Sequence, residues 1–224
     1  MSFGDKKLSE IAVSVPGSTS LLRKYDLDFC CGGSDTLANA AEEKGLNLAE
    51  IETRLTELQN SKAENPEEYW VNATYPEIID HILVRYHQRH REQLQELIVL
   101  ADRVESVHGD REDCPMGVAA ELRNVYEDLS NHMMKEEHVL FPMIKAGNYM
   151  MAQMPIRMME MEHAEHGEHL DVLKSLTNNM TPPADACNTW RALYSGIQEF
   201  ADDLMMHIHR ENNILFPRVI AENH

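Results

Sequence analysis

The stretch EDLSNHMMKEEHVLFP at residues 127–142 is matched without a gap by DDLMMHIHRENNILFP at residues 202–217. Each copy carries Asp-Leu, then a His and a Glu four residues apart, then Leu-Phe-Pro. A repeat of this kind indicates a duplicated structural unit. Four residues make one helical turn, so each His and Glu can approach the same ion, and both are metal-ligand types. The repeat therefore predicts a metal site built symmetrically from two halves.

A second matching pair of histidines stands upstream of each copy. The first is His87-x2-His90-x3-Leu94, and the second is His163-x2-His166-x3-Leu170. The duplicated unit is therefore a helical hairpin with potential ligands on both of its helices.

Composition restricts the function classes. The chain has 224 residues, 43% of them hydrophobic, with a formal net charge of −18 and a pI near 5.0. This charge disfavours nucleic acid and anionic membrane surfaces as partners. The N-terminus lacks the apolar core of a signal peptide, and no apolar run is long enough to cross a bilayer, so we expect a cytoplasmic protein. Four cysteines are too few for a disulfide scaffold, and we expect thiols.

Residues 1–58 are expected to form a small helical domain with a Cys-Cys-Gly-Gly motif. A short helix is expected near 18–25. Ser34 or Asp35 can cap a second helix, and Asn47 can cap a third. Residues 59–75 are polar and interrupt the periodicity, which indicates a linker.

Residues 76–224 show the periodicity of four amphipathic helices, at about 76–107, 116–145, 155–178 and 182–221. Thr181 before Pro182 is the expected start of the last helix. Pro142 and Pro217 should kink or end their helices one turn after the Glu of the repeat. The fold class is therefore all-α: an up-down four-helix bundle preceded by the small helical domain.

The His and Glu of the repeat occupy positions that leucine should fill. The stripe of the first helix is Ile79, Leu83, Tyr86, His90, Leu94, Leu97 and Ala101; that of the second is Val118, Leu122, Val125, Leu129, His132, Glu136 and Val139. A buried unpaired carboxylate or imidazole costs about 1–3 kcal/mol or more, which a bound metal would offset. A lone His-x3-Glu is usually a surface pair, and we interpret His108 and Glu112, beside Gly109, as an accident of this kind.

The ligand number indicates the metal. His132, Glu136, His207 and Glu211 with one histidine from each remaining helix give four His and two Glu. Six ligands are too many for a closed tetrahedral zinc site. Two metals bridged by two carboxylates and an oxide or water fit better, and this mixed ligation suits iron. Periodicity leaves open whether His87 or His90, and His163 or His166, bind the metal.

These residues resemble the hemerythrin-like di-iron proteins over about 76–219. Oxygen-carrying hemerythrins have an Asp where Glu211 stands and a further histidine where Gly167 stands. The missing histidine and the additional cysteine-bearing domain argue against a reversible oxygen carrier. The resemblance is fuller to the iron-sulfur cluster repair proteins of the "repair of iron centres" family, whose small N-terminal domain carries adjacent cysteines. The matching segments are KYDLDFCCGG (24–33), IIDHILVRYHQRHREQL (78–94) and HMMKEEHVLFPMIK (132–145).

The resemblance implies a ligand set and a function. The ligands would be His87, His132, Glu136, His163, His207 and Glu211, holding two iron ions bridged by an oxo or hydroxo group and the two carboxylates. The protein would repair iron-sulfur clusters damaged by oxidative or nitrosative stress by supplying labile iron, and we favour this role over an enzyme. The alternatives are a nitric oxide-reducing di-iron enzyme and a module that senses oxygen, iron or nitric oxide. The implied partners are damaged or apo iron-sulfur proteins, with nitric oxide or dioxygen as small ligands and a homodimer as a candidate assembly.

Other polar residues receive subsidiary assignments. Cys30 and Cys31 are adjacent, so a disulfide between them would strain the backbone, and a following helix N-terminus near Asp35 is expected to lower the thiol pKa and favour a thiolate relay. Asp128 and Asp203 lie one turn before His132 and His207, and they are either hydrogen-bond acceptors for these histidines or charges on the helix surface. Four histidines are expected to be solvated: His81, His138, His169 and His209.

Overall fold

The computed structural model describes residues 2–61 and 63–222. These residues form helices joined by turns, and their one β-type pairing is an isolated bridge between Lys7 and Thr36. The all-α prediction is therefore confirmed. The chain divides into two compact units. One contains residues up to Ile78 together with the segment from Met206 onward, and the other contains Ile79–Met205.

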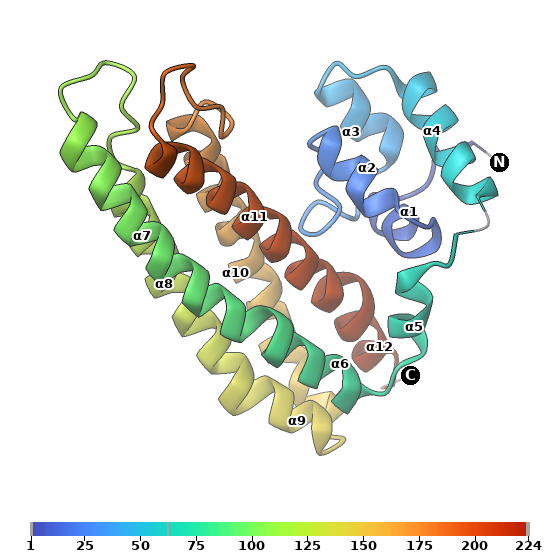
Figure 1. Cartoon of the computed structure of the whole chain (residues 1–224). Coiled ribbons are helices and arrows are strands. Elements are labelled where there is room, and N and C mark those ends of the chain that lie inside the picture. Colours follow the sequence, from blue (N-terminus) through green and yellow to red (C-terminus); the bar gives the residue numbers. More distant parts are fainter. Residues whose placement is uncertain (1, 62, 223–224) are drawn as a thin grey trace. The chain divides into compact units, whose positions relative to one another are not determined.

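The first unit is built from short helices around one core. They are α1 (Leu8–Ser14), α2 (Ser18–Lys24), α3 (Leu37–Glu43), α4 (Leu48–Asn60) and α5 (Pro66–Asn72), with the C-terminal η3 (Glu211–Leu215) and α12 (Phe216–Ala221) (Figure 1). Helix α1 contacts α2, α5 and η3, and α4 contacts α2 and α3. Side chains that are at most 1% exposed fill the core: Leu8, Ile11, Leu22, Leu27, Phe29, Leu37, Ile51 and Leu55.

The caps explain where several of these helices begin. The Asn47 side chain accepts a hydrogen bond from the backbone N–H of Glu50, as expected, whereas α3 is capped by Thr36 rather than by Ser34 or Asp35. The segment expected to be a linker contains α5, capped by Asn65 with Pro66 in its first turn. Glu67 of α5 is buried and forms an ion pair with Arg210. A tertiary contact therefore stabilises this helix in addition to its N-cap.

The second unit is the four-helix bundle. Its long helices are α7 (Gln88–His108), α8 (Val118–Lys135), α10 (Tyr149–Leu176) and most of α11 (Asn188–Arg210), which run alongside one another in Figure 1. The residues of α11 from Met206 onward belong to the first unit. Helix α6 (Tyr75–His81) leads into α7, and α9 (Phe141–Lys145) follows α8. A Cβ atom on Gly196 of α11 would lie 2.7 Å from Leu97 Cδ2 of α7, so a larger residue at position 196 would force the Leu97 side chain to move.

Three π-helical turns interrupt the long helices: η1 (Ile82–His87), η2 (Glu136–Leu140) and η3 (Glu211–Leu215). The last two begin at the Glu of the repeat and are followed by Phe-Pro. Proline has no N–H to donate to the preceding turn, and a wider turn accommodates this loss without ending the helix. The helices therefore continue as α9 and α12 beyond Pro142 and Pro217.

The π turns also correct the expected stripe. An extra residue per turn rotates the following side chains by roughly 100°. Val139, expected in the core, is 43% exposed, whereas Leu140 is 1% exposed. Ile82, the first residue of η1, is fully buried where Leu83 was expected.

Two helix starts differ from the prediction. Helix α10 begins at Tyr149, and Pro155 lies inside it rather than at its start. The fourth long helix begins at Asn188, so Thr181 is not its N-cap. Residues 178–180 have φ angles of 49°, 52° and 52°, and two consecutive prolines follow Thr181. Both features disfavour helical backbone.

Among the described residues, no helix is both long and apolar enough to cross a membrane.

Candidate metal centre

Three residues of the bundle unit bring metal-ligand atoms together. His132 lies in the last turn of α8, Glu136 is the first residue of η2, and His163 lies on α10. Their ligand atoms are within 4.8 Å of one another. The two Nε2 atoms of the histidines are 3.1 Å apart, and Glu136 Oε2 is 3.4 Å from His132 Nε2. All three residues are at most 1% exposed.

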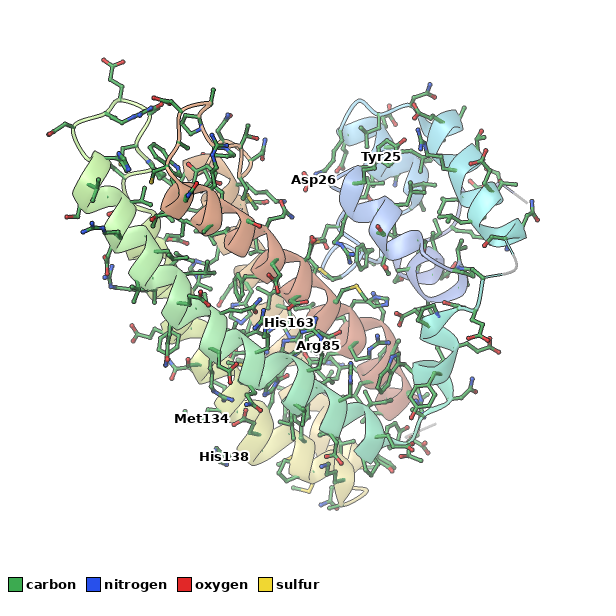
Figure 2. The ribbon with its side chains drawn as sticks, in the orientation of Figure 1. Tyr25, Asp26, Arg85, Met134, His138 and His163 are labelled. Carbon is green, nitrogen blue, oxygen red and sulfur yellow. The ribbon has the colours of Figure 1, made fainter. Side chains whose placement is uncertain are left out.

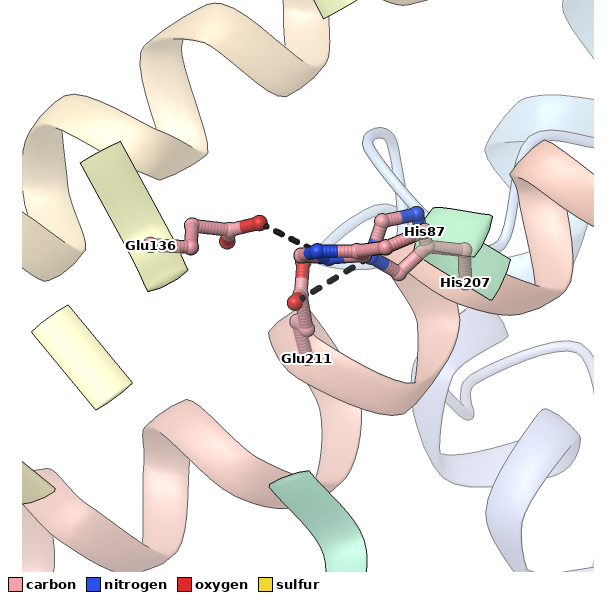
Figure 3. A group of neighbouring side chains, drawn as sticks. All are labelled: His87, Glu136, His207 and Glu211. Atoms are coloured by element: carbon pink, nitrogen blue, oxygen red, sulfur yellow. Dashed lines mark ion pairs between the residues drawn. The ribbon is translucent and has the colours of Figure 1, made fainter. Parts of the chain in front are cut away.

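His87 approaches the same carboxylate from another helix. It is the last residue of η1, is fully buried, and places Nε2 3.3 Å from Glu136 Oε2 (Figure 3). One buried carboxylate oxygen of the bundle therefore faces two imidazole nitrogens.

The other unit carries the second His-Glu pair of the repeat. His207 lies in the last turn of α11 and Glu211 begins η3, and the two residues are 1% and 0% exposed. His207 Nε2 lies 3.3 Å from Glu211 Oε1 (Figure 3). Helical spacing thus brings each pair together within one turn, as the sequence predicted.

Carboxylates fix the rings of two bundle histidines. Glu137 lies 2.8 Å from His87 Nδ1 and Glu162 lies 3.0 Å from His132 Nδ1. Hydrogen bonding to His87, with Arg91 beside it, lowers the pKa of Glu137 to about 2 against the effect of burial. Hydrogen bonding to His132, supported by Lys135, similarly lowers the pKa of Glu162 to about 2.

At His132, Glu162 takes the place that the sequence assigned to Asp128. Asp203 forms an ion pair with Arg85 at 2.6 Å, and Asp128 lies 3.0 Å from His169. The assignment of Asp128 to His132 was therefore wrong. Glu137 follows Glu136 and Glu162 precedes His163, so adjacency to a ligand was the available signal in the sequence.

The donor set fits a divalent metal ion. An ionised carboxylate at Nδ1 accepts a hydrogen bond from Nδ1–H, so the neutral imidazole carries its lone pair on Nε2, the atom that can bind a metal. In the bundle these Nε2 atoms face a carboxylate oxygen and one another at 3.1–3.4 Å. Such a concentration of acceptors in a buried site favours a cation among them.

The remaining histidines are divided between core and surface. His90 and His166 are buried, His90 against Tyr86 and Phe200, and His166 edge-on to His132. His138 is exposed, as expected, and Figure 2 labels it on the outside of the bundle, whereas His163 lies among the helices.

His209 was expected to be solvated and is instead fully buried, in edge-to-face contact with the Phe29 ring. Burial lowers its pKa, although Glu67 opposes this shift.

The Cys-Cys-Gly-Gly turn forms a separate cluster in the first unit. The ligand atoms of Asp28, Cys30 and Cys31 lie within 4.8 Å of one another. Contact with Cys31, burial and the nearby Asp28 carboxylate raise the pKa of Cys30 well above its usual value. The expectation of a lowered thiol pKa is thus wrong for Cys30, because the contact with Cys31, burial and the Asp28 carboxylate all disfavour its thiolate.

Two family models match the chain. The hemerythrin HHE cation binding domain matches residues 78–219. A domain of unknown function, ScdA_N, matches residues 4–59.

Curated relatives match over almost the full length. The chain is 67% identical to a probable iron-sulfur cluster repair protein of Haemophilus influenzae, with 99% of this chain and 100% of the relative covered. It is 54% identical to the iron-sulfur cluster repair protein YtfE of Musicola paradisiaca, over 98% of both chains. It is also 54% identical to the protein of that name in Escherichia coli O81, over 99% of both.

Proposed function

Since the chain belongs to the family of iron-sulfur cluster repair proteins, we propose that it restores iron-sulfur clusters damaged by oxidative or nitrosative stress by supplying iron to them. The relatives carry this function in their names, and an HHE cation binding domain covers the bundle. The recipients are damaged or apo iron-sulfur proteins in the cytoplasm.

The iron would be held in a dinuclear centre with six protein ligands: His87, His132, Glu136, His163, His207 and Glu211. Glu136 and Glu211 would bridge the two ions together with an oxo or hydroxo group. The equivalent positions in the repeat and the burial of both His-Glu pairs support this assignment. Bound in this way, iron provides the ions that a damaged cluster has lost.

The chain's own residues would control how firmly the iron is held. Glu137 and Glu162 fix the Nδ1 protons of His87 and His132 and so direct each Nε2 atom toward the metal. Protonation of a bridging carboxylate would weaken its hold and favour release to a recipient.

Iron storage and iron transfer would take place in different domains. Residues 1–58 would form the cysteine domain, 59–75 the linker and 76–224 the di-iron bundle. Cys30 and Cys31 would relay iron to the recipient, because thiolates bind iron well.

The observation that carries the proposal is the approach of His87 and His132 Nε2 to one buried Glu136 oxygen. The test incubates the reduced, iron-loaded protein with an apo iron-sulfur enzyme without oxygen and follows the recovered activity. We expect recovery that depends on the iron load of the repair protein. Equal recovery with free ferrous iron alone would contradict the proposal.

A double variant tests the relay. Cys30→Ala with Cys31→Ala should keep the di-iron content, because no ligand of the proposed centre is removed, while recovery falls. Cys114→Ala with Cys187→Ala is the matched control. Unchanged recovery in the first variant would make Cys30 and Cys31 structural. No observation favours the nitric oxide-reducing or sensing alternatives, which we do not propose.

A further inference from the structure

In the turn after α2, the sulfur atoms of Cys30 and Cys31 and the carboxylate of Asp28 lie close together. The Sγ atoms of Cys30 and Cys31 are 3.8 Å apart, and Cys30 Sγ is 3.2 Å from Asp28 Oδ1. No described cysteine is in a disulfide. Sulfur ligands with an oxygen ligand are typical of tetrahedral divalent ions that bind thiolate.

The distances agree with coordination of one ion. With metal–sulfur bonds near 2.3 Å and tetrahedral angles, two sulfur ligands lie about 3.8 Å apart, and a sulfur and an oxygen ligand about 3.5 Å apart. The sulfur–sulfur distance in the turn matches, and the sulfur–oxygen distance is 0.3 Å shorter. An ion could therefore enter with little movement of the backbone.

The turn is held rigidly from inside. Asp28 Oδ1 accepts hydrogen bonds from the backbone N–H groups of Cys30 and Cys31, at 3.0 and 2.9 Å, and Oδ2 accepts one from Gly32 at 2.8 Å. A Cβ atom on Gly33 would lie 2.5 Å from the Phe29 carbonyl oxygen, so only glycine allows this close backbone path.

Two asparagines of η3 hold the turn from the other side. Asn212 Nδ2 donates to the Cys30 carbonyl at 2.9 Å, and Asn213 Nδ2 donates to the Phe29 carbonyl at 2.8 Å. These contacts hold the backbone on either side of the two sulfur atoms, so the positions from which the Cys30 and Cys31 side chains extend are fixed.

We infer that Cys30, Cys31 and Asp28 form a second metal site, with three protein ligands and one open position, for a divalent ion that binds thiolate. Each thiol releases its proton to solvent as its sulfur binds the ion. Asp28 is exposed and Cys31 is partly exposed, so an ion can reach the site and leave it. This site would be the place where the proposed relay binds iron. Only the identity of the natural ion, ferrous iron, rests on the proposed function.

Cobalt(II) is the probe, because thiolate bound to cobalt gives a near-ultraviolet charge-transfer band that His and Glu ligands do not give. The full-length metal-free protein is titrated with cobalt(II) without oxygen. We expect the band to saturate at one thiolate-bound cobalt per chain and to disappear when zinc(II) is added, because zinc binds such sites more tightly. Absence of the band would overturn the inference.

Variants locate the site. Cys30→Ser with Cys31→Ser should lose the band, and Asp28→Asn should weaken cobalt binding about tenfold or more. Cys114→Ser with Cys187→Ser should keep the band, and its loss there would place the site elsewhere. Unchanged affinity in Asp28→Asn would remove Asp28 from the ligand set. Circular dichroism of each variant shows whether the fold is retained.

One further variant separates this site from the proposed di-iron centre. Glu136→Leu should keep the thiolate band even though it removes a proposed bridging ligand. If the thiolate band forms but the His-Glu centre holds no iron, only the site at Cys30, Cys31 and Asp28 is supported. If iron is held but no thiolate band forms, only the di-iron centre is supported.

Discussion

The Oε2 atom of Glu136 lies 3.3 Å from the Nε2 atom of His87, although the two residues belong to different helices of the bundle. Both side chains are fully buried. An imidazole nitrogen without a proton turns its lone pair toward the carboxylate oxygen there. This arrangement costs free energy in a buried site unless a cation lies between the two atoms. This pair makes a metal centre the natural explanation for the polar interior of the bundle.

Removal of this carboxylate should remove the metal and keep the fold. For Glu136→Leu we expect a loss of iron affinity larger than the roughly 10–100-fold loss seen when outer partners are removed. The metal-free variant should be no less stable than the metal-free parent, because leucine suits a buried helical stripe. Metal analysis and thermal unfolding measure the two effects. Glu112→Leu, on an exposed residue, should retain its iron, and full iron content in Glu136→Leu would exclude Glu136 as a ligand.

The carboxylate behind His132 should tune metal affinity without binding metal. For Glu162→Gln we expect iron to bind roughly 10–100-fold more weakly, because the Nδ1 proton loses its charged acceptor. Competition with a chelator gives the affinity, and the neighbouring exposed Glu160→Gln is the matched control. Equal affinities for the two variants would show that the Glu162 contact has no such role.

The register of the π turn can be tested by paired truncations. Leu140→Ala should lower the free energy of unfolding by roughly 2–5 kcal/mol, because it opens a cavity in the core. Val139→Ala should change it by no more than about 0.5 kcal/mol, as for other exposed side chains. Denaturant unfolding of the metal-free variants measures both changes. A larger loss of stability for Val139→Ala than for Leu140→Ala would contradict the π turn and support an uninterrupted α-helix.

His169 should give the bundle a pH-dependent contribution to stability. Burial alone would lower the pKa of His169, but hydrogen bonds to Glu121 and Asp128 raise it. A raised folded-state pKa stabilises the fold below the unfolded value, near 6.5, and this contribution is lost as pH rises through the folded pKa. His169→Gln should therefore lower stability at pH 6 more than at pH 9.

Unfolding of the metal-free protein at both pH values measures this difference, with exposed His138→Gln as the control. A His169→Gln effect that is the same at pH 6 and pH 9 would show that the ion pairs contribute nothing through the imidazole charge.

Much of the local structure could be predicted from the residues. The gapless repeat and its apolar periodicity predicted a helical bundle, and Asn47 predicted the start of α4. The sequence also predicted that His132 and Glu136, and His207 and Glu211, lie one turn apart. These features depend on helix geometry within a few residues, which the chain determines locally.

The tertiary structure decided which remote groups meet. It brought Glu137 to His87, it brought Glu162 rather than Asp128 to His132, and it buried His209 against Phe29. Periodicity could not show this, because each π turn rotates the residues that follow and because such contacts depend on the packing of distant segments. The raised pKa of Cys30 has the same origin, since it results from contact with Cys31, from burial and from the nearby Asp28 carboxylate, which the folded turn brings together.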